Sequence, residues 1–217
     1  SCGEPVSREK DEAVVRCTNT DCPAQLLRHL IHFVSRNAMD IDGLGKAVLE
    51  QLVENKLIAS SSDIYKLKEN DVTNLERMGE KSASNLISAI EKSKENPLHR
   101  LIFALGIRHI GEKAAKLLCA VYSNIDEIFN ATVEAVAEIE GFGDIMAENL
   151  VEYFSLPHTK ELIEEFRELG VNLKSEEKHI DNQIFKGQTF VLTGTLPTLK
   201  RSEAAKLIED LGGKTSS

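Results

Sequence analysis

Aromatic side chains are scarce in this sequence: they make up 5% of its 217 residues, and tryptophan is missing altogether. A chain so poor in aromatics does not favour a β-sandwich, whereas its many Leu, Ile, Ala, Glu and Lys residues favour small helical cores. No uninterrupted apolar run approaches the roughly 18 residues that a membrane-spanning helix needs. The hydrophobic content of 41% is still sufficient for packed cores, which excludes wholesale disorder.

Cysteine is also sparse, with four residues in the whole chain. Four cysteines at this length do not make a disulfide scaffold, and they favour an intracellular, reducing environment. The N-terminal stretch 1–12 is polar and charged, so no secretory signal is present in it. We therefore expect a cytoplasmic protein that has no membrane partner.

Positive charge is in deficit. The chain has 26 basic and 35 acidic residues, a net charge of −9 and an isoelectric point near 5.3. Proteins that coat nucleic acid usually neutralise phosphates with a basic surface. Bulk charge therefore argues against DNA binding, and any such hypothesis must rest on local geometry.

Three of the four cysteines, Cys2, Cys17 and Cys22, follow the spacing C-x14-C-x4-C. This layout is typical of a zinc ribbon, in which short hairpins hold thiolates. Structural zinc has four ligands, so one is missing from this set. We expect it to be a cysteine upstream of the first residue, with His29 or His32 as the alternative. Three unrelated free thiols are the remaining interpretation.

An internal repeat is the strongest signal in the sequence. Four glycine-containing turns each run into an apolar helical pattern, and their second glycines are 34, 32 and 32 residues apart. We number these turns as hairpins 1 to 4: Gly43–Gly45, Arg77–Gly79, His109–Gly111 and Gly141–Gly143. The pattern predicts four units of helix, tight hairpin and helix.

A helix that begins directly after such a turn has first-turn amides without a partner inside the helix, at the positive end of its dipole. Glycine permits positive φ and lets the backbone come close to a ligand. Together these features predict a seat for a phosphate oxygen at each hairpin. Main-chain amides bind phosphate whatever the net charge, and contacts to phosphate report no base sequence.

The predicted DNA-binding residues are the hairpin glycines and the basic residues beside them: Gly43, Gly45, Lys46, Gly79, Lys81, Arg108, His109, Gly111, Lys113, Gly141 and Gly143. A single glycine turn would be more typical of an ordinary helical hairpin. Four at nearly constant spacing, three of them followed by a lysine, favour nucleic acid. Hairpin 4 is surrounded by acidic residues and has no such lysine, so we expect it to contribute least to DNA affinity.

A second architecture begins near Asn182. Residues 185–195 have the pattern of a buried strand, residues 201–211 that of an amphipathic helix, and a second strand would follow. About 35 residues rarely make a stable domain. A parallel strand here would also lack a partner. We therefore expect this tail to be poorly packed or partly disordered.

These features together resemble one family, the bacterial NAD-dependent DNA ligases, over nearly the whole chain and in the family's order. The most specific stretches are 17–25 (CTNTDCPAQ), 39–45 (MDIDGLG) and 105–111 (LGIRHIG). The resemblance implies a C-terminal fragment that is mainly α. It would contain a zinc finger lacking its first cysteine at 1–34, four helix-hairpin-helix motifs at 35–155, a helix and linker at 156–181, and the start of an α/β BRCT domain at 182–217.

The resemblance also implies a function. The parent enzyme would seal nicks in duplex DNA with NAD and magnesium, and this part would clamp the duplex from its minor-groove side. The chain has no Lys-x-Asp-Gly adenylation motif, so we expect neither ligation nor self-adenylation from it alone. The expected cofactor is zinc at Cys2, Cys17 and Cys22. Nicked or intact duplex DNA and the upstream ligase domains are the expected partners of a monomer in the bacterial cytoplasm, at the nucleoid.

Two other functions stay open. One is the DNA-binding module of a repair or recombination protein that is not a ligase. The zinc finger and the BRCT segment argue against this function. The other is a helical protein-interaction scaffold in which the glycines only make turns. Steep salt dependence of DNA binding would distinguish phosphate contacts from that scaffold.

Overall fold

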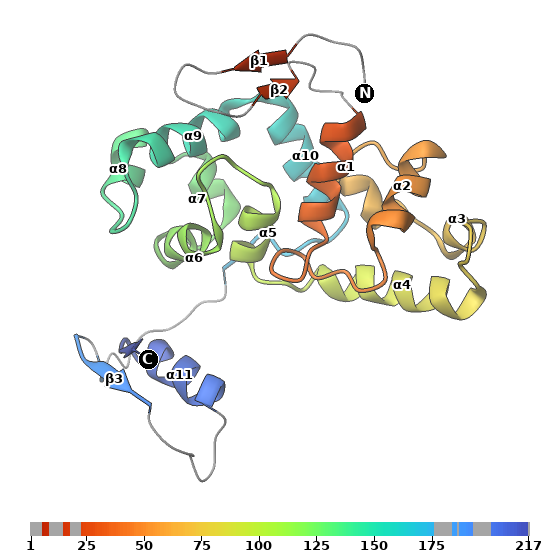
Figure 1. Cartoon of the computed structure of the whole chain (residues 1–217). Helices are drawn as coiled ribbons and strands as arrows, with labels where there is room; N and C mark the ends of the chain where they lie inside the picture. Colours follow the sequence, from red (N-terminus) through yellow and green to blue (C-terminus); the bar gives the residue numbers. More distant parts are fainter. Residues whose placement is uncertain are drawn as a thin grey trace. The chain divides into compact units, whose positions relative to one another are not determined.

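The computed structural model of the chain (Figure 1) describes residues 6–8, 15–17, 23–175, 184–185, 187–192 and 201–216. The chain divides into two compact units, Ser1–Glu176 and Glu177–Ser217. It is mainly α, as the composition predicts. None of the helices in the described ranges is long and apolar enough to cross a membrane.

The described part of the first unit contains a β-hairpin and a series of helices. The strands β1 (Val6–Arg8) and β2 (Val15–Cys17) pair antiparallel, with Val6 opposite Cys17. The helices are α1 (Pro23–Phe33), α2 (Lys46–Glu54), α3 (Glu69–Thr73), α4 (Glu80–Ser93), α5 (Leu98–Ala104), α6 (Glu112–Val121), α7 (Ile125–Phe129), α8 (Val133–Ala137), α9 (Asp144–Ser155) and α10 (Pro157–Glu168), with the 3-10 helix η1 (Ser62–Lys66). The helices α2, α4, α6 and α9 begin directly after hairpins 1 to 4, as the repeat predicts.

One continuous apolar core runs through these helices. Each helix after a hairpin turns its apolar stripe inward, as Leu49 and Leu52 of α2 and Leu86 and Ile90 of α4 do. This burial follows from apolar residues spaced three and four apart, which fall on one face of a helix. The hairpins are therefore held by helices that pack in one core, and they are not part of free loops.

The helix α10, the last described helix of the first unit, packs against its first helix, α1. The rings of Phe33 in α1 and Phe166 in α10 stack with their centroids 5.8 Å apart, and Tyr65 of η1 meets Phe166 edge-on at 5.9 Å. Burial raises the pKa of Tyr65 to about 12, because the phenolate would lose its hydration. Segments before hairpin 2 and after hairpin 4 thus share one aromatic cluster.

A polar network supports the same joint. The hydroxyl of the buried Ser62 donates to the Glu165 carboxylate of α10. Lys66 donates to Glu165 and to Asp63, each at 3.0 Å. The hydrogen bonds from Ser62 and then Lys66 lower the pKa of Glu165. At Asp63, burial acts to raise the pKa, but bonds from the Ala59 amide, Lys66 and Ser60 outweigh it and the pKa is lowered.

These lowered pKa values predict a loss of stability in acid. A carboxyl whose folded pKa is depressed stabilises the fold above its unfolded pKa, near 4, and this contribution disappears as the pH falls through the folded value. We expect the free energy of unfolding to fall below about pH 4.5, and Glu165→Gln to make that fall shallower. Urea denaturation at a series of pH values measures both slopes. Glu161→Gln on the same helix is the control, and identical slopes for Glu165→Gln and the unaltered chain would contradict the prediction.

The described residues of the second unit form a small β-α-β arrangement. The strands β3 (Thr189–Val191) and β4 (Lys214–Ser216) pair parallel, and the helix α11 (Arg201–Asp210) connects them in the chain. The expectation that the parallel strand lacks a partner is therefore wrong. A Cβ on Gly213 would lie 2.7 Å from the Ile208 side chain, so helix and second strand meet too closely there for a larger residue.

One other expectation for this end of the chain needs correction. The predicted strand at 185–195 is not buried where the structure describes it, because β3 has only three residues and Val191 is 60% exposed. The Leu98 amide donates to the Lys174 carbonyl and the Ser175 amide to the Ser123 carbonyl, so both residues belong to the first unit.

Candidate nucleic-acid interface

The four hairpins have the same backbone. In each, the residue between the two glycine positions donates its amide to the carbonyl three residues earlier: Leu44 to Ile41, Met78 to Leu75, Ile110 to Ile107 and Phe142 to Ile139, at 2.9–3.3 Å. The first glycine position has positive φ each time: +85° at Gly43, +63° at Arg77, +62° at His109 and +96° at Gly141. The repeat read from the sequence is therefore a repeat of main-chain geometry.

The residue between the glycines anchors each turn. Leu44, Ile110 and Phe142 are buried, and Met78 is half-buried against the core. An apolar side chain thus fixes each turn to the core. The glycines of hairpins 1 and 4, and Gly79 and Gly111, stay at the surface. This is the arrangement that the sequence predicts.

The two glycine positions have different roles, which the sequence pattern alone does not separate. Gly45, Gly79, Gly111 and Gly143 have φ between −75° and −115°, in the extended region that any residue adopts. A Cβ placed on any of them would meet no atom within 4 Å. Neither strain nor crowding inside the protein therefore requires glycine at the second position. What the missing side chain leaves is open space over a helix N-terminus.

The helices after the hairpins also lack side-chain caps. Each of the four second glycines is the N-cap residue of its helix, and none provides a capping hydrogen bond. Elsewhere in the same unit, Asn124 accepts from the Glu127 amide at the start of α7 and Thr132 from the Ala135 amide at the start of α8. First-turn amides without such a cap remain available to an external acceptor, and an anion suits them best.

Basic side chains stand beside three of the hairpins. Lys46 is the first residue of α2, and its side chain is 68% exposed at 3.5 Å from Glu50. Lys81 and Lys113, the second residues of α4 and α6, are exposed, and so is His109. Arg108 is half-buried. Each of hairpins 1 to 3 therefore combines open amides with a nearby cation.

Hairpin 4 has different surroundings. The position that holds lysine after hairpins 2 and 3 is occupied by Ile145, which is 64% exposed. Glu140, Asp144 and Glu148 are exposed around it. A Cβ on Gly141 would lie 3.0 Å from Leu117, so this turn packs tightly against α6. Both its charge and its packing set hairpin 4 apart.

The negative charge of the molecule is concentrated in the part of the sequence that contains hairpin 4. Residues 23–121, which include hairpins 1 to 3, contain 14 Lys and Arg against 12 Asp and Glu, a net charge of +2. Residues 122–175 contain 3 against 12, a net charge of −9, which equals that of the whole chain. The net charge of the whole chain therefore says little about the surroundings of the first three hairpins.

Residues of α5 and of the turn before it hold the loop that leads to hairpin 1. The Arg100 guanidinium donates from Nε to the Ala38 carbonyl at 2.6 Å, and the Asn96 amide donates to the Met39 carbonyl at 2.7 Å. Their partners lie about sixty residues earlier in the chain. No sequence pattern signals such contacts, and neither residue is among those predicted from the sequence.

The candidate zinc ligands are only partly within the described residues. Cys2 and Cys22 lie outside them, and Cys17 is described by its backbone in β2. The alternative ligand His32 has another role: its Nε2 lies 2.8 Å from the Phe103 carbonyl oxygen, and its ring packs edge-on against Phe103. In the part of the chain that the structure describes, no three His, Cys, Asp or Glu side chains gather as a metal site. Three thiolates remain a donor set that suits zinc.

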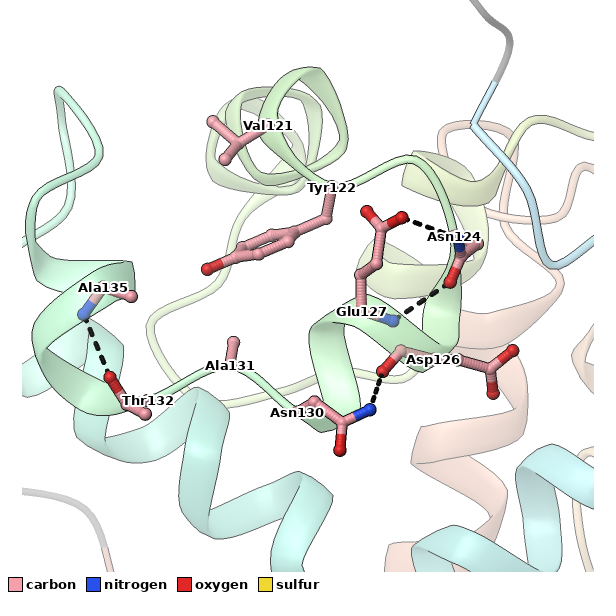
Figure 2. A pocket seen from close by; sticks show the side chains of 9 residues that line it. All are labelled: Val121, Tyr122, Asn124, Asp126, Glu127, Asn130, Ala131, Thr132 and Ala135. Atoms are coloured by element: carbon pink, nitrogen blue, oxygen red, sulfur yellow. Dashed lines mark hydrogen bonds between the residues drawn. The ribbon is translucent and has the colours of Figure 1, made fainter.

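A shallow pocket of about 620 Å³ lies beside the end of α6 and the starts of α7 and α8 (Figure 2). Most of its polar side chains already form hydrogen bonds or ion pairs within the protein. Glu127 accepts from the Ser123 amide at 2.7 Å, Asp126 forms an ion pair with Arg167 at 2.6 Å, and Thr132 caps α8. The bonds of Glu127 and Thr132 lie at helix starts, and the Asp126 ion pair connects α7 to α10. These groups form no nucleophile-and-base pair.

Four family models match this chain, in the order of segments that the resemblance predicts. Residues 1–24 match the NAD-dependent DNA ligase C4 zinc finger domain, residues 35–92 the SAM-like helix-hairpin-helix tandem, residues 100–163 the helix-hairpin-helix motif and residues 181–217 the BRCA1 C Terminus (BRCT) domain. The four matches confirm the kinds of segment that the resemblance predicts.

Curated relatives match the chain from end to end. A DNA ligase of Clostridioides difficile is 51% identical over 218 residues, which cover 100% of this chain and 32% of that protein. DNA ligases of Syntrophomonas wolfei and Anoxybacillus flavithermus are each 49% identical over all of this chain and 33% of their own length. The chain thus spans about a third of the length of the curated relatives it matches. By these matches the chain belongs to the NAD-dependent DNA ligase family. It corresponds to about one third of the length of such a ligase.

Proposed function

We propose that this chain is the DNA-binding part of an NAD-dependent DNA ligase, and that it grips duplex DNA without regard to base sequence. The observation that carries the proposal is the repeated N-cap glycine. Four helices begin at an exposed glycine with open space above it and no side-chain cap. Main-chain amides at such a site bind a phosphate oxygen and contact no base edge.

The proposed contacts follow the hairpins. Gly45, Gly79 and Gly111 begin the helices whose amides bind phosphate, and Lys46, Lys81 and Lys113 add a cation beside each. Gly43, Arg108 and His109 belong to the turns that bring the backbone to the DNA. Gly141 and Gly143 have the same geometry in acidic surroundings, so hairpin 4 contributes least. The near-neutral charge of residues 23–121 allows a polyanion to approach this surface.

The wider role is part of the same proposal. The parent ligase would use NAD and magnesium to seal nicks in replication and repair, in the bacterial cytoplasm at the nucleoid. This chain, without a Lys-x-Asp-Gly motif, would supply the grip on the duplex and carry no ligation activity by itself. Cys2, Cys17 and Cys22 would hold zinc in the segment that connects the clamp to the upstream domains. The domain limits that we propose are 1–34, 35–155, 156–181 and 182–217.

A salt titration tests the proposal. Fluorescence anisotropy would follow binding of the full chain to nicked duplexes of two unrelated sequences. Three lysine–phosphate contacts predict that log K falls by about 2.7 for each tenfold rise in salt, because each releases condensed counterions at a slope of about 0.9. The two sequences should bind within about twofold of each other. Absence of binding at low salt would favour the interaction scaffold, and a strong sequence preference would contradict a phosphate grip.

A further inference from the structure

We propose that Gln51 is a positioning residue that holds hairpin 2 in register with hairpin 1, so that their two phosphate seats engage one DNA backbone together. Gln51 lies in α2, the helix that follows hairpin 1. Its side-chain oxygen accepts the amide of Glu76 at 2.7 Å, 25 residues later and directly before the turn of hairpin 2. Its nitrogen points back to the Ala47 carbonyl at 3.5 Å. The side chain thus connects the two hairpins.

The backbone at hairpin 2 gives this hydrogen bond a strained turn to stabilise. Arg77 occupies the position with positive φ, +63°, which disfavours side chains other than glycine. Hairpins 1 and 4 have glycine there, with Gly43 and Gly141 at +85° and +96°. Glu76 immediately precedes Arg77, so the hydrogen bond from its amide fixes the turn next to its strained residue.

A second contact makes the connection reciprocal. A Cβ on Gly43 would lie 3.8 Å from the Leu86 side chain, so the turn of hairpin 1 rests on α4, the helix that follows hairpin 2. The helix of hairpin 1 in turn holds the backbone of hairpin 2 through Gln51. Each hairpin is therefore positioned by the helix of the other. Two seats at fixed spacing bind one polyanion more tightly than two independent seats, since orienting the first also orients the second.

The first arm of the test needs no DNA. Gln51→Leu keeps the side-chain volume close to that of glutamine and removes the acceptor. Amide hydrogen exchange should become about tenfold faster at Glu76, as expected for the loss of one hydrogen bond, and stay unchanged at the buried Ile90. Asn55→Ala is the matched control, because it also removes one hydrogen bond of α2, from Asn55 to the Gln51 carbonyl, without touching hairpin 2. Unchanged exchange at Glu76 would overturn the inference.

The second arm rests on the proposed function and measures DNA affinity. Gln51→Leu should weaken binding of nicked duplex about five- to tenfold, the scale of one lost hydrogen bond. The same substitution should add nothing once Gly79→Ser has capped the seat of hairpin 2, and should keep its full effect beside Gly111→Ser. A merely structural role would give equal losses in both backgrounds and would overturn the inference alone. Absence of binding by the unaltered chain would overturn the proposed function as well.

Discussion

Replacing Gly45 and Gly111 by serine should strengthen the fold and weaken DNA binding in the same protein. Both glycines are N-cap residues with extended backbone, φ −75° and −86°, which serine adopts without strain. The serine hydroxyl would accept a first-turn amide of α2 or α6 and cap the helix. That amide is one that the phosphate would otherwise use, so folding and binding compete for the same donor.

The expected magnitudes are different for the two effects. Serine exceeds glycine as an N-cap by a few tenths of a kcal/mol at each site. Loss of a hydrogen bond to a charged phosphate costs about 1.5 kcal/mol or more, so binding should weaken about tenfold at each hairpin and about a hundredfold in the double variant. Serine is neutral, which excludes charge repulsion as the cause. Urea denaturation and anisotropy titrations of the same samples measure the two quantities.

Hairpin 4 provides the matched control. Gly143 has the same N-cap position and the same open space as the other second glycines, so Gly143→Ser should give a similar gain in stability. Because acidic residues surround this hairpin, the DNA affinity of the Gly143→Ser variant should stay within about twofold of that of the unaltered chain. Unchanged binding by the Gly45→Ser, Gly111→Ser double variant would show that the main-chain amides do not bind the DNA.

The elements that the sequence predicts correctly are those with local causes. Hairpins 1 to 4 and the helices after them depend on a glycine turn, an apolar anchor such as Leu44 and apolar residues spaced three and four apart, all of which lie within about fifteen residues of chain. The difference between Gly43 and Gly45 was not predicted. Both are glycine, and only the backbone angles distinguish them. Gly43 provides a positive φ, whereas Gly45 leaves open space over the N-terminus of α2.

The features that the sequence did not predict are long-range. Nothing near Gln51 indicates that its side chain meets Glu76, and nothing near Arg100 indicates that it meets Ala38, because each contact depends on how separate helices pack. The pairing of β3 with β4 is another such contact, because it depends on how α11 brings the two strands together. The uneven distribution of charge along the chain can be counted from the sequence, but the net charge of −9 does not reveal it. Residues 122–175 alone have a net charge of −9.

Phe166→Ala should lower the free energy of unfolding by about 3–5 kcal/mol, a far larger change than serine causes at any hairpin. Phe166 is fully buried at 0% exposure, stacks on Phe33 and meets Tyr65 edge-on. Removing its ring leaves a cavity between α10, α1 and η1. Because these elements flank the hairpins at both ends of the unit, all four hairpins should lose stability together in one cooperative transition.

Urea denaturation followed by both far-UV and near-UV circular dichroism tests that expectation. Coincident transitions shifted to lower urea would show that the unit unfolds as one core. Leu162→Ala, at a half-buried position of the same helix, is the control and should cost clearly less. Two separate transitions, or a loss below about 1 kcal/mol, would mean that α10 does not hold the two ends of the first unit together. At urea concentrations where the variant is folded, its DNA affinity should equal that of the unaltered chain, since Phe166 lies in the core and in none of the proposed phosphate seats.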